Sequence, residues 1–508
     1  MLAYHYLSAL ELVGAADAEE VPELEANAIR YLALAGERAL ALDVERAEAS
    51  LAKALALAPA GHPERASLLE GWAHAALQQN RLQEARGALE EALALYREQG
   101  EDVAAGRVLT ALSNVLVRLG DPRGDKAIAD GLDLLKAQPP GPELVAAYAE
   151  LAAARLVGSS FPEAIAAAGR ALELAAELGL PEPARALGNR GSARAALGER
   201  QGLEDMRRAL ALALEQGQGR TAAVLHNNLA LGTWQYEGPR AALAACREGI
   251  DFCERRGIAA FALAIAAMST TFLAELGRSE QALAEALPLA ERLEAAGDIA
   301  FTEPRSQQLR LLAERGAHEQ APAADELLAT ARESGQPQGY AVAASAAVRL
   351  LLAEAHKKRA SALLVELEQV VGLRADPYYA AALSELVRSA AALGQPELAT
   401  RLVDGVEPRT PLFDHALSAC RAQLGEAAGE HAEAAQLYAE AAERWLTFGN
   451  VPERAYALLG QGRCLTALGK SEAEGPLREG RELFASMGFT PAVAEVDGLL
   501  GSPSAAAL

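Results

Sequence analysis

The chain has 508 residues and a formal net charge of −22, and 51% of its residues are hydrophobic although only 5% are aromatic. The acidic balance argues against general nucleic-acid binding, which relies on Lys and Arg side chains that contact phosphates. Alanine and leucine supply much of the hydrophobic content, which favours thin helical layers over one large core. No run of alternating Val, Ile, Thr or aromatic residues predicts a strand.

The cysteines do not form a metal or redox motif, because no two of them have CxxC spacing: Cys246, Cys253, Cys420 and Cys464. We therefore expect no metal site, no cofactor, no disulfide framework and a reducing, cytoplasmic location. The N-terminus lacks the basic region and cleavage site of a signal peptide. Residues 257–274 carry no charge over a length that could cross a bilayer. They fall in phase as the first helix of a repeat, so we expect no membrane span.

In chain order, helices are predicted over residues 1–19 and 25–41, the first closed by Gly14 and Asp17, and Asp43 is placed to cap a third helix. From there one unit repeats: a helix, a tight turn that usually carries glycine, a second helix opened by a small residue, and a link with Gly or Pro. Two short helices cannot bury their apolar stripe alone. Stacking of neighbouring units is therefore predicted to build the array.

The position that opens the second helix recurs twelve times over 426 residues (473 − 47), or about 39 residues a step. Eleven of these residues are alanine and one is glycine: Ala47, Ala85, Ala127, Ala164, Gly202, Ala242, Ala282, Ala321, Ala360, Ala399, Ala434 and Ala473. The turn before this position supplies an independent signal at the same phase, because it usually carries Gly or Asn: Asn80, Gly120, Gly198, Gly238, Gly277, Gly316, Gly394, Gly429 and Gly469. Both residue types tolerate the left-handed backbone that ends a helix.

The repeat phrase resembles the tetratricopeptide repeat (TPR): glycine, a short polar turn, alanine, a bulky residue four positions later and alanine three after that. Good copies are Ala47–Leu51–Ala54, Ala85–Leu89–Ala92 and Ala434–Tyr438–Ala441. The resemblance covers about residues 25–490, although these units are longer than the usual 34 residues. It implies an all-α, TPR-like α-solenoid, wound as a right-handed superhelix of about twelve helical hairpins.

Longer units with linkers such as YREQGED resemble the C-terminal arrays of bacterial signalling proteins. In those proteins a STAND-type ATPase, often beside a cyclase, kinase or LuxR-type DNA-binding domain, precedes the repeats. The resemblance implies that residues 1–24 form a leading helix at the end of such an ATPase module, that residues 25–490 form the array, and that residues 491–508 supply a capping helix and a frayed tail.

Catalytic motifs are missing from the sequence. It has no Walker A motif, no HExxH, no GxSxG and no Gly-rich fingerprint after a strand, and its eight histidines are dispersed. We therefore expect a protein that is not an enzyme.

Arginines recur at one phase of the array, since Arg310, Arg349 and Arg388 are spaced 39 residues apart and Arg463 lies six residues before its turn glycine. In the family this place on the first helix faces the concave groove, where extended peptides lie. A ladder of arginines there would bind an acidic segment through charge-assisted hydrogen bonds.

Each of these site predictions has an alternative. The arginines could instead be paired with nearby glutamates, such as Glu314 or Glu385, in surface pairs worth about 0–1 kcal/mol. Asn189, Asn227 and Asn228 could hold a peptide backbone or serve only as polar surface and helix-stabilising residues.

The sequence thus predicts a non-catalytic protein–protein interaction scaffold, the sensor or regulatory arm of a bacterial signalling system. Three hypotheses stay open: a scaffold acting in trans, the arm of a multidomain ATPase–cyclase, kinase or transcriptional regulator acting in cis, and an α-helical enzyme with an unrecognised site. The partner and the oligomeric state are left open.

Overall fold

The computed structural model describes residues 2–13, 21–40 and 42–501. Within these residues the chain forms 26 α-helices, four 3-10 helices of three residues each and no strand. Helices α2 to α25 alternate as the first and second helices of twelve hairpins, with α1 before them and α26 after them. The predicted all-α array of about twelve helical hairpins is confirmed.

The first helices of the hairpins are α2 (Val21–Ala39), α4 (Arg65–Gln78), α6 (Asp102–Arg118), α8 (Pro142–Val157), α10 (Ala184–Ala196), α12 (Gly219–Glu237), α14 (Ala259–Glu275), α16 (Thr302–Glu314), α18 (Pro337–Ala353), α20 (Pro377–Ala392), α22 (Pro411–Ala427) and α24 (Val451–Ala467). The second helices are α3 (Val44–Leu57), α5 (Leu82–Gln99), α7 (Arg123–Lys136), α9 (Phe161–Glu177), α11 (Gln201–Glu215), α13 (Pro239–Glu254), α15 (Ser279–Ala295), α17 (Ala324–Glu333), α19 (Lys357–Glu368), α21 (Pro396–Val403), α23 (His431–Phe448) and α25 (Glu474–Met487). The remaining elements are α1 (Leu2–Val13), α26 (Thr490–Gly501), η1 (Ile299–Phe301), η2 (His318–Gln320), η3 (Leu373–Ala375) and η4 (Ser471–Ala473).

The second hairpin shows why this sequence pattern forms a repeat. Asn80, two residues after the end of α4, has a φ of 63°, and the chain reverses there into α5. Ala85, Leu89 and Ala92 share one face of α5 and are all 0% exposed. Two small residues on that face let α4 approach closely, while the leucine between them fills the space that remains.

The turn residues adopt the backbone that the sequence predicted. Each glycine of that set, and Asn80, has a positive φ, between 63° and 94°. Two hairpins that lack glycine at this place use other residues, Ser159 (φ 55°) and Ala355 (φ 61°). The array therefore imposes a left-handed turn even on residue types that rarely adopt it.

Three predicted boundaries differ from the structure. Helix α2 begins at Val21 and not at residue 25. The cap of the next helix agrees with the prediction, since Asp43 accepts from the backbone N–H of Arg46 at the start of α3. Ala321 does not open a helix, because Pro322 follows it and disfavours a helical backbone there; Ala321 is extended, and α17 begins three residues later. Ala473 ends the 3-10 turn that precedes α25. Gly14, Asp17 and the predicted tail of residues 502–508 lie outside the described part of the chain.

The small residue that opens the second helix is expected to be intolerant of bulk. Ala85 and Ala282 are 0% exposed, so leucine at either place would overpack the hairpin and lower the free energy of unfolding by about 1–3 kcal/mol. Urea unfolding followed by circular dichroism measures the change, with Ala94→Leu on the exposed face of α5 as the control. Equal midpoints for Ala85→Leu and Ala94→Leu would contradict the expectation.

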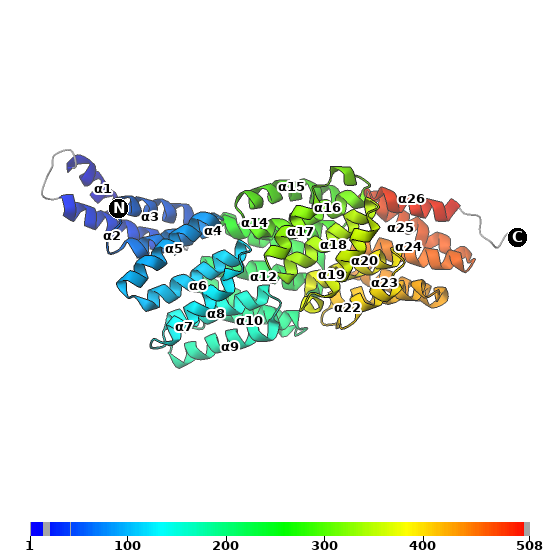
Figure 1. Cartoon of the computed structure of the whole chain (residues 1–508), viewed down its shortest axis with the longest axis horizontal. Coiled ribbons are helices and arrows are strands. Elements are labelled where there is room, and N and C mark those ends of the chain that lie inside the picture. The colour runs from blue at the N-terminus through cyan, green and yellow to red at the C-terminus, as the bar shows by residue number, and fades with distance from the viewer. Residues whose placement is uncertain (1, 14–20, 41, 502–508) are drawn as a thin grey trace.

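The array winds so tightly that segments five to six hairpins apart lie against each other (Figure 1). Helix α4 contacts α14, α12 contacts α22, α14 contacts α24 and α16 contacts α26. The amide of Gln336 donates to the carbonyl of Val117, 219 residues away in sequence, at 2.7 Å. The hydroxyl of Ser159 donates to Asp376, 217 residues away, at 2.8 Å. The inner surface is therefore not an open groove along its whole length.

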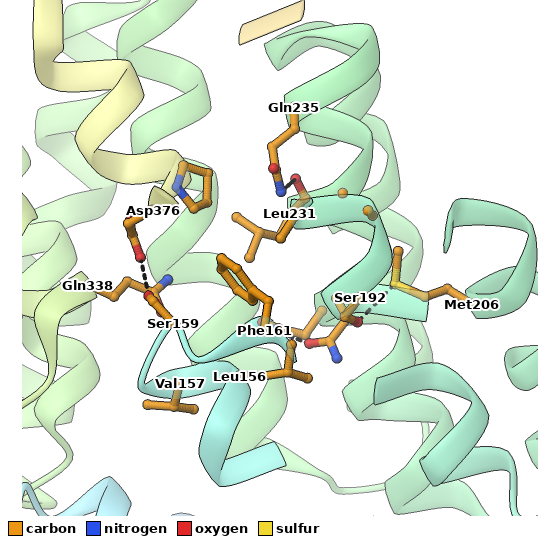
Figure 2. Close-up of a pocket in the computed structure, with 16 residues that line it drawn as sticks. Leu156, Val157, Ser159, Phe161, Ser192, Met206, Leu231, Gln235, Gln338 and Asp376 are labelled. Carbon is orange, nitrogen blue, oxygen red and sulfur yellow. Dashed lines mark hydrogen bonds between the residues drawn. The ribbon is translucent and has the colours of Figure 1, made fainter. Parts of the chain in front are cut away.

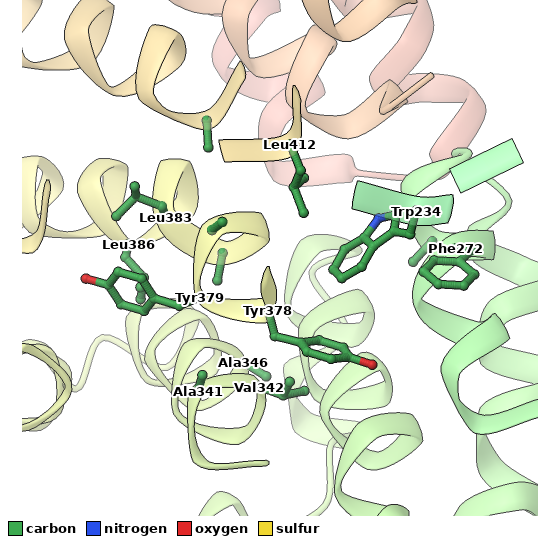
Figure 3. Close-up of a cluster of buried hydrophobic side chains, with 14 of the residues drawn as sticks. Trp234, Phe272, Ala341, Val342, Ala346, Tyr378, Tyr379, Leu383, Leu386 and Leu412 are labelled. Carbon is green, nitrogen blue, oxygen red and sulfur yellow. The ribbon is translucent and has the colours of Figure 1, made fainter. Parts of the chain in front are cut away.

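Aromatic side chains pack among aliphatic ones where α12 meets α14, α20 and α22 (Figure 3). Trp234 is fully buried, and its ring centroid lies 5.4 Å from that of Phe272 and 5.3 Å from that of Tyr378. The indole N–H donates to Glu275 at 2.7 Å, which satisfies the one polar atom of the ring. This aromatic cluster joins the two halves of the array.

Residues 257–274 correspond closely to α14, the first helix of the seventh hairpin. Among the described helices, none combines the length and apolar character that crossing a membrane requires.

Candidate functional site

The first helices face the inner side of the array, and ion pairs join them one hairpin apart. Arg107 on α6 donates to both carboxylate oxygens of Glu70 on α4, at 2.6 and 2.8 Å, and Arg185 on α10 donates to Glu150 on α8 at 2.6 Å. In each pair the arginine follows the glutamate by 37 or 35 residues. The inner face therefore carries charged pairs at the spacing of the repeat.

Two of the four predicted site arginines follow the same rule. Arg349 on α18 donates to both oxygens of Glu314 on α16, at 2.7 and 3.0 Å. Arg463 on α24 donates to both oxygens of Glu426 on α22, at 2.8 and 2.9 Å. Such two-point pairs are the strong form of an arginine–carboxylate contact.

The other two arginines reach further along the chain. Arg388 on α20 donates twice to Glu453 on α24, at 2.7 Å each, and stacks 4.1 Å from the ring centroid of Tyr456. Arg310 on α16 contacts Glu385 on α20 at 3.2 Å. Each of the four arginines is therefore in contact with a glutamate, and Arg388 also stacks on an aromatic ring.

The sequence left open that the arginines pair with nearby glutamates on the surface. Such pairs are present, but their glutamates are buried. Glu314 and Glu385 do pair with Arg349 and Arg310, yet these glutamates are only 4% and 7% exposed, and Glu453 is 8% exposed. They are buried pairs, whose separation leaves an unpaired charge in the interior. The value of about 0–1 kcal/mol that is typical of exposed ion pairs therefore does not apply to these pairs.

The electrostatics of these groups follow from burial and pairing. Burial disfavours the charge on Arg349, but Glu314 outweighs this and holds the pKa of the guanidinium above its ordinary value. Burial likewise disfavours a charged Glu426, but Arg463 outweighs it, and the pKa of that carboxyl is lowered. Burial raises the pKa of Glu385, and Arg310 offsets this only in part.

Three of the predicted arginines line one cavity of about 620 Å³, which we call the C-terminal chamber. Its charged lining residues are Arg349, Arg388, Arg463, Glu314, Glu385, Glu426 and Glu495. Arg310 does not line the cavity, but it contacts Glu385, which does. The volume falls within the ~300–1,000 Å³ that is usual for ligand sites.

The capping helix α26 closes one side of this chamber. Pro491, Ala492 and Glu495 line it, and Glu495 accepts from Arg463 at 3.0 Å. Helix α26 also contacts α16, the first helix of the chamber wall. The chamber is thus bounded by the inner helices of the last five hairpins and by the cap.

The predicted asparagines lie elsewhere, in two cavities near the middle of the array. A cavity of about 320 Å³ is lined by Asn189, Asn227 and Asn228 among others, and one of about 160 Å³ shares Asn227 and Asn228 with it. Asn189 is only 1% exposed, and its amide donates to the carbonyl of Ala149 at 2.7 Å. These cavities share no lining residue with the C-terminal chamber. The structure therefore does not bring the asparagines and the arginines together.

The smaller cavity lies where the turn before α9 meets the start of α20 (Figure 2). Asp376 and Ser159 lie on one side of it and Ser192 and Met206 on the other, with Phe161 between them. Asp376 is 2% exposed, and burial raises the pKa of its carboxyl to about 6 although Ser159 donates to it. This carboxyl and the hydroxyl of Ser159 form a contact between successive turns of the array.

Sequence inspection missed the glutamates that pair with the ladder on α22 and α24, Glu426 and Glu453. The signal for Glu426 was present, because it precedes its arginine by 37 residues, as Glu70 precedes Arg107. Glu453 carried no such signal, since it lies 65 residues after Arg388. The partner of Arg388 depends on how the turns of the array stack.

Metal clusters and activated thiols are two common kinds of reactive group, and the described residues bear on both. No group of three or more His, Cys, Asp or Glu residues there is arranged to hold a metal ion. The four cysteines are buried, and burial raises the pKa of each thiol, which disfavours the reactive thiolate.

Twelve stacked hairpins that bury small, large and small residues define a TPR-like helical solenoid. No family model matches the sequence, and no curated protein matches it. Solved structures that match this chain include the following two. One is a signal transduction ATPase with numerous domains (STAND) from Pyrococcus horikoshii that has a tetratricopeptide repeat sensor, at 13% identity and a TM-score of 0.41, over 77% of this chain and 56% of that one. The other is yeast Tom70, at 14% identity and a TM-score of 0.32, over 90% and 92%. The chain thus spans little more than half the length of the STAND structure.

Proposed function

We propose that this protein is a non-catalytic interaction scaffold that binds a segment of a partner protein in its C-terminal chamber. The observation that carries the proposal is the chamber itself, about 620 Å³ in volume and lined by charged side chains of both signs. Charged groups placed on packed helices and held by their neighbours recognise a partner at little ordering cost, because their geometry is set before binding.

The proposal differs from the sequence expectation in the charge of the partner segment. A purely acidic segment would have to displace Glu314, Glu426 or Glu453 from arginines that already form two hydrogen bonds each. A segment that offers donors to the glutamates meets no such competition.

The scaffold is further proposed to serve as the sensor or regulatory arm of a bacterial signalling system in the cytoplasm. It would act on separate proteins in trans, or in cis with an ATPase, cyclase, kinase or DNA-binding module. The reading frame immediately upstream of the gene distinguishes these arrangements, since an ATPase or cyclase encoded there favours action in cis.

Blocking the chamber is expected to abolish partner capture. Ala392, the last residue of α20, is exposed and lines the chamber, so Ala392→Trp adds bulk there without entering the core. The matched control is Ala432→Trp, at an exposed alanine of α23 that is not among the chamber residues. Tagged wild type and both variants are cross-linked in native lysate and the captured proteins are quantified by mass spectrometry.

A partner captured by the wild type and by Ala432→Trp, but reduced about tenfold or more with Ala392→Trp, supports binding in the chamber; tenfold corresponds to ~1.4 kcal/mol. Equal capture by all three chains would move recognition to another surface and overturn the proposal.

A further inference from the structure

The charges around the C-terminal chamber do not balance. Three arginines and four glutamates line it. Arg310 and Glu453 do not line the cavity but pair with residues that do, and they bring the totals to four arginines and five glutamates. One carboxylate is therefore in excess in a region where charged groups are expected to be paired.

Glu385 is the carboxylate with the poorest partner. Arg349, Arg388 and Arg463 each donate to both oxygens of one glutamate. The contact between Arg310 Nε and Glu385 Oε2 lacks hydrogen-bond geometry, since Arg310 Nε has no hydrogen-bond partner. The other oxygen, Glu385 Oε1, has no hydrogen-bond partner either. Glu385 is 7% exposed, and its Oε1 is buried.

A second unpartnered acceptor lies on the adjacent helix, α22, which packs against α20. The side-chain oxygen of Gln423 on α22 has no hydrogen-bond partner, and the residue is 5% exposed and lines the chamber. Buried acceptors without a donor are unfavourable, and a ligand that brings a donor removes the penalty. The chamber therefore has one more carboxyl group than arginines and two buried acceptors without a donor, and both features point to the same ligand chemistry.

We propose that the chamber recognises a basic side chain, lysine or arginine, of the bound segment, with Glu385 as its counter-ion and Gln423 as a further acceptor. The inference rests on the proposed function, and it names the chemistry that the site selects. The arginine ladder then has a structural part in recognition. Arg349, Arg388 and Arg463 each hold one glutamate by two hydrogen bonds, whereas Arg310 contacts Glu385 at only one oxygen.

Peptide pools provide the test. Immobilised pools of random pentapeptides, each with Lys, Arg, Asp, Glu or Gln fixed at the centre, are probed with the full chain at low ionic strength, where electrostatic discrimination is largest. The wild type is expected to retain the Lys and Arg pools at least fivefold above the Asp and Glu pools. Glu385→Gln, which keeps the shape of the side chain and removes its charge, is expected to reduce that ratio towards one.

Two further variants separate binding from folding. Glu495→Gln removes a carboxylate at the rim, where its side chain is 49% exposed, and is expected to weaken the preference for basic pools without disturbing the core. Glu433→Gln, an exposed residue of α23 away from the chamber, is expected to leave the preference unchanged. Circular dichroism and thermal unfolding establish that each variant is folded.

The outcomes distinguish the two proposals. Retention of acidic pools, or of all pools alike, would overturn recognition of a basic side chain while leaving peptide binding in the chamber intact. Failure of the wild type to retain any pool would overturn binding in the chamber, and with it the proposed function. A basic preference that survives both Glu385→Gln and Glu495→Gln would place the recognition elsewhere and overturn the inference.

Discussion

Replacing Arg388 by methionine is expected to lower the free energy of unfolding by about 3–5 kcal/mol, because it leaves the buried carboxylate of Glu453 without a partner. The same change removes the guanidinium that stacks on Tyr456, so a planar contact is lost as well. Urea unfolding followed by circular dichroism, with fluorescence as a second probe, measures the loss.

Two controls distinguish the effect of breaking a buried ion pair from the effect of removing an arginine side chain in general. Arg332 pairs with Glu366 on the outside, with side chains 45% and 42% exposed, and Arg332→Met is expected to cost about 0–1 kcal/mol. The double change Arg388→Met, Glu453→Met removes both buried charges and is expected to recover most of the stability lost by the single change. A single change no more costly than Arg332→Met would show that the pair at Arg388 is not buried in solution.

Because the arginines are buried in ion pairs, their substitution is not a suitable test of partner binding. Reversing the ladder arginines to glutamate would set like charges against Glu314, Glu426 and Glu453 inside the array. Loss of a partner in such a variant would report loss of the fold. Substitutions at exposed lining residues such as Ala392 avoid this difficulty.

A methyl group at Gly198 is expected to push two turns of the array apart. Gly198 has a φ of 94°, and a Cβ there would clash with the backbone carbonyl of Arg409. Gly217 also has a positive φ, 68°, but a Cβ there would meet nothing within 4 Å. Alanine at either place carries the cost of a left-handed backbone, about 1–2 kcal/mol, and only Gly198→Ala carries an overpacking cost of about 1–3 kcal/mol in addition.

The comparison of these two variants isolates the contact between turns. Urea unfolding gives the difference in stability, and small-angle X-ray scattering gives the radius of gyration of the folded chain. We expect the larger destabilisation and a larger radius of gyration for Gly198→Ala alone. Indistinguishable behaviour of the two variants would mean that the turns do not touch in solution.

Local pattern was enough to predict the hairpins. Glycine at the turn and alanine four or five residues later recur because each hairpin has to solve the same packing problem, a left-handed reversal followed by a close helix contact. Even the exception at Gly202 has a physical reason, since a Cβ there would clash with the backbone of Gly191 and Ala195 on α10. The failure at Ala321 is also local, and Pro322 explains it.

The partners of the ladder were only partly predictable. Glu314 and Glu426 lie about one repeat before their arginines, so spacing alone could have identified them. Glu385 and Glu453 lie 75 and 65 residues after theirs, on helices that come close only when the array has wound. Spacing in the sequence does not encode how far the array turns at each hairpin.

By itself the sequence determined the fold class, the phase of the hairpins and the positions of their left-handed turns, because these depend on residues within about one repeat of each other. Only the tertiary structure decided that successive turns touch, as at Ser159 and Asp376, that the inner space is divided into separate cavities, and that the arginines are buried in pairs. The physical reason is that small rotations between neighbouring hairpins add up along the chain, and their sum sets which distant surfaces meet.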